Sequence, residues 1–225
     1  MNTIAANFNY ISNPWWNFDL GEAVQFYWPI SIEKYLRRAH GKSVKNIFKS
    51  HHALGFFEEI MDYIAGQFHI FYIYRDPRDV LVSNWKLIRS LGWDEGPKPE
   101  TASLFLRAEP RGGMLRYQKR QERNMLTRWW THVQQWTELA KSRPDYGICV
   151  LSYEELNLDF ETAVRKIGRA LNQSPEAVRR PDVDENVVGS GNGKVGNYLE
   201  YLNDEDLAFV TDEIGEALER FNYSA

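Results

Sequence analysis

Several features that would assign this sequence to a specialised class are absent or scarce. The chain has a single cysteine, Cys149, which excludes an internal disulfide and a metal site built from a cysteine cluster. No apolar run approaches the twenty residues that a membrane-spanning helix needs, and no stretch has the composition of a signal peptide. We therefore expect no bound metal, no membrane association and a cytoplasmic location.

An excess of positive charge is also missing. The formal net charge is −4 at pH 7 and the pI is about 5.8. A protein with this balance has no global basic field that would attract nucleic acid, so we expect no nucleic-acid partner. Any site for an anionic ligand must then be local.

What the sequence does contain is typical of a globular protein. Hydrophobic residues make up 43% and charged residues 26% of the 225 residues, which argues against general disorder. This length suits one domain with a full-sized core, and no linker divides the chain, so we predict a single domain over residues 1–225. Oligomeric state stays open.

Hydrophobic patterning predicts alternating strands and helices. The predicted strands are residues 44–49, 69–74 and 147–152. The predicted helices are residues 31–40, 53–66, 77–90, 115–142, 160–171 and a last helix capped by Asn203. The stretch 115–142 is either one long helix or two joined ones. The run "HIFYIY" is apolar almost throughout, as in a strand that is buried on both faces. The alternation predicts an α/β fold with three layers, in which helices flank a mainly parallel sheet.

The stretch "FYIYRDPRDVLVSNWK", residues 71–86, joins a strand to a helix in a sharp turn. Asp76 stands at the N-cap, Pro77 at the first helical position and Asp79 where a capping box closes. Ligands bind along the carboxyl edge of open α/β sheets, where Arg75 would present a guanidinium suited to a phosphate. Ser83 lies two helical turns beyond Asp76 on the same face. The alternative is that Arg75 only pairs with a neighbouring aspartate.

The segment "YIYRDPRDVLVS" closely resembles the part of cytosolic-type sulfotransferases that binds the 3′-phosphate of PAPS, 3′-phosphoadenosine 5′-phosphosulfate. In that family a strand-terminal arginine and a serine eight residues later bind this phosphate, and these fall on Arg75 and Ser83. The resemblance implies a sulfotransferase fold related to P-loop NTPases, PAPS as co-substrate and a small-molecule acceptor.

Further segments resemble the same family in the same order, so that the resemblance covers roughly residues 44–225. "IFKSHH", 47–52, is similar to the Lys-Thr-His signature and implies that Lys49 contacts the transferred sulfuryl group and His51 is the base. "VLSYEELNLDF" implies that Tyr153 contacts the adenine, and "GKVGNYLEYLNDED", 193–206, resembles the closing Gly-x-x-Gly-Asp-Trp segment.

These residue types suit sulfuryl transfer. The reaction needs a cation on the transferred group and a base for the acceptor hydroxyl, which a lysine and an imidazole can supply. On a strand, Lys49 and His51 would face the same side and Ser50 the other. His52 is the less favoured base, because the family signature aligns on the first histidine of the pair.

Two departures from the family pattern affect donor binding. The family begins with a Pro-Lys-Ser-Gly-Thr-Thr-Trp loop that binds the 5′-phosphosulfate, and nothing before Lys49 matches it. The "GKS" at 41–43 is no substitute, since Leu36 stands where a Walker loop needs glycine. The family's Arg-Lys-Gly triplet aligns with residues 191–193, Gly-Asn-Gly, which leaves Lys194 as the nearby cation for the 3′-phosphate.

Three functions are compatible with this sequence. The first is a PAPS-dependent sulfotransferase, represented here without its first strand and loop, so that the chain as given transfers little sulfate. The second is a catalytically degenerate protein of the same fold that acts as a nucleotide-binding or interaction module. The third is a nucleotide kinase with a similar sheet, which no Walker loop supports. We expect the aromatic segments 13–18 and 26–28 either to line a hydrophobic acceptor pocket or to belong to the core or an interface.

Overall fold

The computed structural model describes residues 2–10, 33–34, 36–37, 45, 47–175, 177–181 and 194–223. The chain divides into two compact units, each built from two stretches of sequence. Unit 1 consists of Met1–Ile73 and Trp136–Asp182, and unit 2 of Tyr74–Gln135 and Val183–Ala225.

Two of the three predicted strands, those over 69–74 and 147–152, are present among the described residues, and helices lie between and beside them. The α-helices and strands are α1 (Asn2–Phe8), α3 (Met61–Gln67), β1 (Phe71–Tyr74), α4 (Pro77–Ser90), α5 (Ala102–Arg107), α6 (Met125–Ser142), β2 (Cys149–Ser152), α7 (Tyr153–Leu158), α8 (Phe160–Leu171) and α9 (Asp204–Arg220). The short 3-10 helices are η3 (Leu54–Phe56), η4 (Glu58–Ile60), η5 (Gly112–Tyr117), η6 (Pro144–Tyr146) and η7 (Asn197–Glu200).

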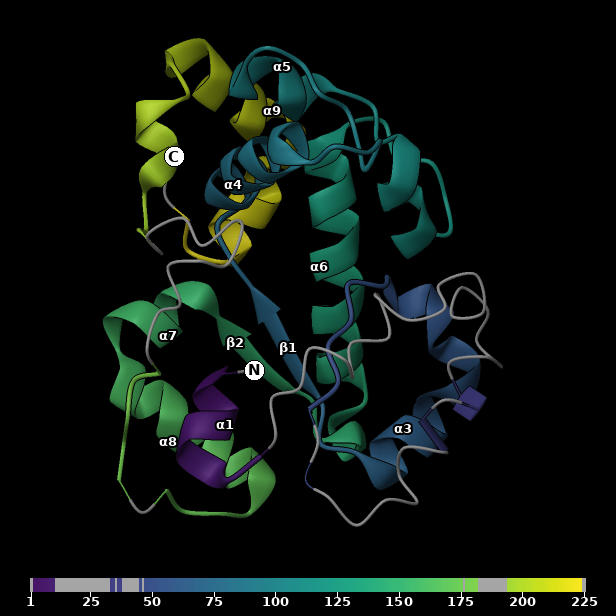
Figure 1. Ribbon diagram of the computed structural model, residues 1–225, viewed down its shortest axis with the longest axis vertical. Helices are drawn as coiled ribbons and strands as arrows, with labels where there is room; N and C mark the ends of the chain where they lie inside the picture. The colour runs from purple at the N-terminus through teal and green to yellow at the C-terminus, as the bar shows by residue number, and fades with distance from the viewer. Residues whose placement is uncertain are drawn as a thin grey trace. The chain divides into compact units, whose positions relative to one another are not determined.

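The described sheet contains two parallel strands, β1 and β2, side by side (Figure 1). Their pairing begins where the backbone amide of Cys149 donates to the carbonyl of Ile70, at 2.9 Å. The chain between the strands contains α4, α5 and α6, because parallel strands need a crossover connection. The α/β fold with a parallel sheet is thus confirmed.

The core of unit 1 forms where α1 and α8 pack against β2. It comprises the buried side chains Ile4, Phe8, Cys149, Leu151, Phe160, Val164, Ile167 and Leu171. The α8 members recur every three or four residues, which places them on one face of the helix. Burial raises the pKa of the Cys149 thiol, in agreement with the buried, unreactive cysteine that its apolar run predicts.

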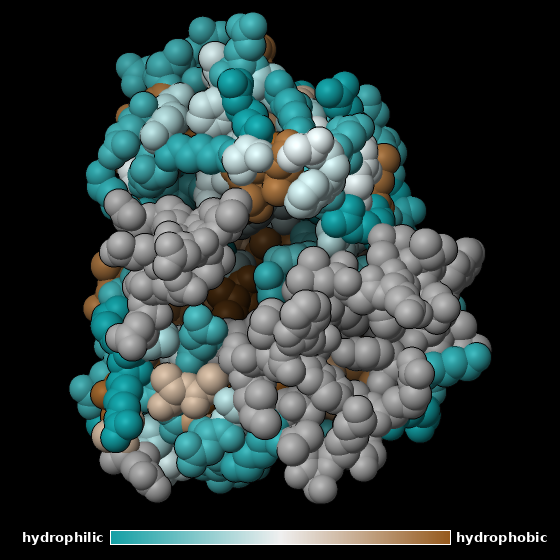
Figure 2. Space-filling view, viewed as in Figure 1, coloured by the Kyte–Doolittle hydropathy of each residue, from teal (hydrophilic) through white to brown (hydrophobic). Residues whose placement is uncertain are grey.

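The core of unit 2 is built by helices that bury one face each. Its buried apolar side chains include Leu81, Val82, Ile88, Phe105, Leu106, Met125, Leu126, Val210, Ile214 and Leu218. The α9 members lie on the buried face of the last helix, and Asn203 confirms its predicted cap by accepting a hydrogen bond from the amide of Asp206. In Figure 2 the surface over α4, α5 and α9 carries mainly hydrophilic side chains.

Two predictions about strands are wrong. Residues 45 and 47–49 form no strand, and Ile47 and Phe48 are both half-buried although they are neighbours in the sequence. Phe48 packs edge-on against Phe68 with ring centroids 6.0 Å apart, so its burial needs no strand partner. In β1, Tyr72 is buried but Ile73 is 47% exposed, so this strand is not buried on both faces.

Two predicted helices are shorter than their sequence patterns. The one predicted over 53–66 consists of η3, η4 and α3, and the one over 115–142 becomes α6 only at Met125. Asn124 fixes this start, because its Oδ1 accepts from the amide of Thr127 at 2.9 Å. The helix predicted over 31–40 lies mostly outside the described residues, as do its Gly41 cap and the aromatic segments 13–18 and 26–28. Among the described residues, no helix has the length and apolar character to cross a membrane.

Candidate functional site

The junction between β1 and α4 begins with a capped helix. The Asp76 side chain accepts a hydrogen bond from the amide of Arg78 at 2.9 Å, and Pro77 occupies the first turn, where it loses no helical hydrogen bond. This confirms the helix start that the sequence predicts. The amino terminus of α4, with its partial positive charge, therefore directly follows the carboxyl end of β1.

Arg78 is bound by the same capping residue. Its Nη2 donates to Asp76 Oδ2 at 2.7 Å and its Nε to Oδ1 at 3.0 Å, and both side chains are buried. The Arg78 guanidinium also lies 4.3 Å from the centroid of the Tyr198 ring. Burial alone would lower the pKa of Arg78, but the hydrogen bond and charge of Asp76 outweigh it and raise the pKa. Arg78 therefore acts as a structural cation.

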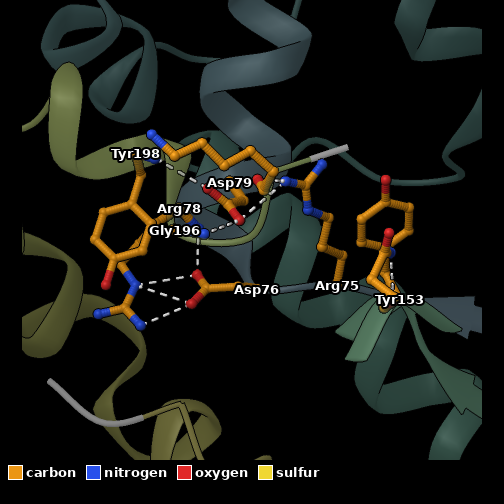
Figure 3. Close-up of polar contacts among 9 residues, drawn as sticks. Arg75, Asp76, Arg78, Asp79, Tyr153, Gly196 and Tyr198 are labelled. Atoms are coloured by element: carbon orange, nitrogen blue, oxygen red, sulfur yellow. Dashed lines mark hydrogen bonds and ion pairs between the residues drawn. The ribbon is translucent and has the colours of Figure 1, made fainter. Parts of the chain in front are cut away.

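Asp79 binds a segment more than a hundred residues away in the sequence. Its Oδ2 accepts from the amide of Gly196 at 2.9 Å and its Oδ1 from the amide of Tyr198 at 3.0 Å. The sequence predicts Asp79 as the acceptor that closes a capping box, whereas the structure directs both of its oxygens to residues 194–198 (Figure 3). We call these residues the 194–198 segment.

Arg75 connects β1 to the same segment. Its Nη2 donates to Asp79 Oδ2 at 2.9 Å and to the carbonyl of Lys194 at 2.8 Å. The Arg75 side chain is 17% exposed and that of Asp79 is fully buried. The pairing with a neighbouring aspartate, which the sequence analysis keeps as an alternative to ligand binding, is therefore present in the structure.

The segment needs glycine at one position. Gly196 has φ = 81°, in the left-handed region that other residues rarely adopt, and a Cβ there would meet nothing within 4 Å. The need for glycine therefore comes from the backbone conformation and not from crowding. This turn presents the amides of Gly196 and Tyr198 to Asp79.

The other predicted donor-site residues of unit 2 lie on α4 and on the 194–198 segment. Ser83 is half-buried on α4. The ammonium of Lys194 donates to Glu200 Oε1 at 2.7 Å, a hydrogen bond that raises the pKa of Lys194, while its carbonyl contacts Arg75. The structure thus places the backbone carbonyl of Lys194 beside the Arg75 guanidinium, while the Lys194 ammonium group pairs with Glu200. Residues 191–193 lie outside the described residues.

The predicted catalytic residues lie in unit 1. Lys49 and His51 are both exposed, on a stretch without regular secondary structure. Between and beside them, Ser50 Oγ lies 2.8 Å from His52 Nδ1 and accepts from the amide of His52 at 3.0 Å. The buried His52 ring packs edge-on against Phe56 at 5.0 Å. Sequence reasoning missed this Ser50–His52 contact, because it expected a strand with Ser50 facing away.

Tyr153, the predicted adenine contact, is the first residue of α7 and is half-buried. The helix start is fixed by a capping box in which Ser152 Oγ accepts from the amide of Glu155, and Glu155 accepts from the amide of Ser152. Tyr153 thus directly follows the carboxyl end of β2, as Arg75 directly follows that of β1. Each of these side chains stands at the end of a strand, where α/β proteins commonly bind ligands.

The chemistry that the junction supports is the binding of an anion by a guanidinium beside a helix amino terminus. The charges of Arg75 and Arg78 are balanced by those of Asp76 and Asp79, so the four side chains have no net charge. No group of three or more His, Cys, Asp and Glu that could bind a metal ion occurs among the described residues.

Three comparisons with known proteins each find sulfotransferases. The family model described as the sulfotransferase domain matches residues 8–188. This match begins before the region 44–225 in which the sequence analysis places the resemblance, and it ends before the 194–198 segment.

Two curated proteins of Cavia porcellus are similar in sequence. A 3-beta-hydroxysteroid sulfotransferase is 29% identical over 152 residues, which cover 64% of this chain and 47% of the relative. A 3-alpha-hydroxysteroid sulfotransferase is 26% identical over 133 residues, which cover 59% and 40%. The chain thus spans about half the length of the curated relatives that it matches.

The fold is similar to that of the mouse sulfotransferase SULT7A1, whose crystal structure contains PAP. The TM-score is 0.59 at 16% sequence identity, and the match covers 86% of this chain and 76% of the mouse protein. At this identity the likeness concerns the fold.

Proposed function

Because the chain belongs to the sulfotransferase domain family, we propose that it transfers a sulfuryl group from PAPS to a hydroxyl or amine of a small-molecule acceptor. The observation that carries the proposal is the position of Arg75, directly between β1 and the capped amino terminus of α4. A planar guanidinium at that place matches the geometry of a phosphate group.

The proposal gives each predicted site residue a separate role. Arg75 and Ser83 bind the 3′-phosphate, and Tyr153 contacts the adenine. The acceptor oxygen attacks the sulfur, the bond from sulfur to the 5′-phosphate oxygen breaks, and PAP leaves. Lys49 stabilises the charge on the transferred group, and His51 takes the proton of the acceptor hydroxyl.

The electrostatics of the junction support weak donor binding. Asp79 already accepts a hydrogen bond from Arg75, so a phosphate at this arginine adds negative charge beside a buried carboxylate. If Lys194 left Glu200, its positive charge would offset the negative charge of the phosphate. An exposed ion pair such as Lys194–Glu200 contributes little stability, so it is easily broken. We therefore propose Lys194 as a contact that forms only when the nucleotide is bound.

The acceptor class follows from the curated relatives. Both are named for hydroxysteroids, so hydroxysteroids and simple phenols are the first acceptors to test. Each offers a hydroxyl that a histidine base can deprotonate.

A second candidate function is a nucleotide-binding or interaction module that no longer transfers sulfate. The Arg75–Asp79 and Lys194–Glu200 pairs favour it, because each of these cations already has a carboxylate partner without a ligand. Both functions require nucleotide binding, and turnover separates them.

Calorimetry with PAP tests the shared requirement. Loss of one charge-assisted phosphate contact costs about 1.5–3 kcal/mol, so Arg75→Ala should weaken PAP affinity roughly ten- to over a hundred-fold. Arg75→Lys keeps a charge beside Asp79 and should weaken PAP binding less. The matched control is Arg165→Ala, which removes an exposed arginine of α8 whose partner is Glu161. Because the proposal places Arg75 on the 3′-phosphate, adenosine 3′-monophosphate should also lose affinity in Arg75→Ala.

Equal PAP affinity in wild type and both Arg75 variants would remove Arg75 from the site. Circular dichroism of each variant checks that a lost signal does not come from unfolding.

A further inference from the structure

The stretch from η5 to the first turn of α6 is strongly basic. Residues 116–128 contain five arginines and lysines and one acid, Glu122. All lie in unit 2, and no role in the proposed sulfuryl transfer has been given to them.

Three of these arginines have carboxylate partners. Arg116 pairs with Glu95 at 2.7 Å and Arg120 Nε with Glu122 Oε1 at 2.6 Å. Arg123 pairs with Glu213. These contacts account for their charges, so none of the three is a candidate for an external ligand.

Arg128 differs because its partner is a neutral amide. Its Nε donates to Gln118 Oε1 at 2.7 Å, and within the described part of the chain no carboxylate lies within the 4.0 Å of an ion pair. Gln118 is itself oriented, since its Nε2 donates to the carbonyl of Arg120 at 2.9 Å. The amide oxygen therefore fixes one edge of the guanidinium.

The other edge of the guanidinium keeps contact with solvent. Neither Nη atom of Arg128 is among the buried polar side-chain atoms that lack a partner, and no hydrogen bond of either is found among the described residues. The two Nη groups thus present parallel N–H donors in the geometry that matches two oxygens of one anion.

The charge at this place is only partly neutralised. Burial lowers the pKa of Arg128, while the charges of Glu95 and Glu122 act in the opposite direction. Arginine stays protonated at neutral pH, so the side chain holds a poorly solvated positive charge. Among the side chains that these ion pairs and the charges acting on Arg128 involve, three arginines, Arg116, Arg120 and Arg128, face two carboxylates, Glu95 and Glu122, an excess of one positive charge.

We propose that Arg128, oriented by Gln118, binds a singly charged oxyanion group, a carboxylate or a sulfate ester, through its two Nη groups. One uncompensated charge suits a monoanion better than a phosphate dianion, and the free edge of the guanidinium offers bidentate contacts. The site does not depend on PAP binding at Arg75 and would hold for either function proposed above.

Titration followed by NMR tests the site residue by residue. Acetate and methyl sulfate serve as the carboxylate and sulfate-ester probes, at constant ionic strength with chloride as the balancing anion. The side-chain Nε–H signal of Arg128, assigned by its absence in Arg128→Gln, should shift and saturate with one or both probes. The probe that saturates the signal at the lower concentration shows whether the site prefers a carboxylate or a sulfate ester.

Gln118→Glu is the sharpest variant. It places a carboxylate of the same shape against Arg128 Nε and so supplies the missing counter-charge within the chain. Anion affinity at the Arg128 signal should fall at least about tenfold. The variant also loses the hydrogen bond from Gln118 to the carbonyl of Arg120, so its melting temperature is measured to confirm that it is folded. The matched control, Gln121→Glu, adds the same charge at an exposed neighbouring glutamine whose amide binds Glu109 and the carbonyl of Pro110.

The proposal fails if the Arg128 signal does not saturate with either probe, or if Gln118→Glu leaves the response unchanged. The PAP affinity of Gln118→Glu, measured by calorimetry, should equal that of wild type. A failure of the Arg128 proposal and a failure of the Arg75 proposal therefore give different results.

Discussion

Asp79 has the largest structural role of any single residue at the junction. It is fully buried and accepts hydrogen bonds from Arg75, Gly196 and Tyr198. A buried carboxylate is stable only when paired and hydrogen-bonded, and these three donors meet both conditions. They also join α4 to the 194–198 segment within unit 2, so the position of Arg75 depends on this one side chain.

Asp79→Asn should destabilise the protein by about 3 kcal/mol, measured as the free energy of unfolding in urea. The amide removes the charge that pairs with Arg75 and turns an N–H group toward one of the two backbone donors. Release of the 194–198 segment should also speed cleavage by trypsin after Lys194. Glu161→Gln, which neutralises an exposed carboxylate paired with Arg165, is the control and should change the stability little. Equal stabilities of the two variants would contradict the role given to Asp79.

At the residue scale the sequence predicts local contacts and misses distant ones. The Asp76 cap depends on residues two positions apart and was predicted correctly. The partners of Asp79 lie 117 and 119 residues away, and no local pattern distinguishes them from a capping box. The proposed roles of Arg75, Ser83, Tyr153, Lys49, His51 and Lys194 come from the family resemblance and stay predictions.

Helix α8 ends in a tight chain reversal that depends on a small residue. The amide of Gln173 donates to the carbonyl of Gly168 at 2.9 Å, and Asn172 has φ = 52°. A Cβ on Gly168 would lie 2.6 Å from the carbonyl oxygen of Gln173 and 3.3 Å from the Phe8 ring. In α9, by contrast, a Cβ on Gly215 would meet Thr211 at 3.6 Å, an ordinary contact.

These two glycines should respond to alanine with opposite signs. Gly168→Ala should destabilise the protein by about 1–3 kcal/mol, because crowding against backbone outweighs the gain in helix propensity. Gly215→Ala, next to the kink of α9 at Ile214, should stabilise it by up to about 1 kcal/mol, since its Cβ has room and alanine restricts the unfolded chain. Thermal and urea unfolding of both variants measure the difference. A gain in stability for Gly168→Ala would show that the reversal after α8 is not as close as described.

At the element scale the sequence is most informative where a cap and a periodic face coincide. This holds for α4, α8 and α9, whose starts were predicted and which each bury one apolar face. It fails at residues 44–49, because apolar residues in a short run show which side chains are buried but not whether the backbone finds a partner strand. It also fails before α6, where Asn124 stops the helix inside a favourable pattern.

For the whole molecule, the proposed roles are distributed over both units. Lys49, His51 and Tyr153 belong to unit 1, and Arg75 and Ser83 to unit 2. The single-domain interpretation stays a prediction, since the chain divides into two compact units. Activity measurements can assign the two sets of residues to one reaction independently of their geometry.

The last prediction separates chemistry from donor binding. His51→Ala should lower kcat for sulfate transfer from labelled PAPS by about 10²–10⁴-fold, the usual contribution of a general base, and leave PAP affinity unchanged. Arg75→Ala should raise KM for PAPS roughly ten- to over a hundred-fold, because it removes a contact made before the transition state. Arg165→Ala should leave both constants unchanged. PAP binding without measurable transfer to hydroxysteroids or phenols would favour the binding module. Turnover that survives His51→Ala would assign the base to another residue, and the buried His52 beside Ser50 would be tested next.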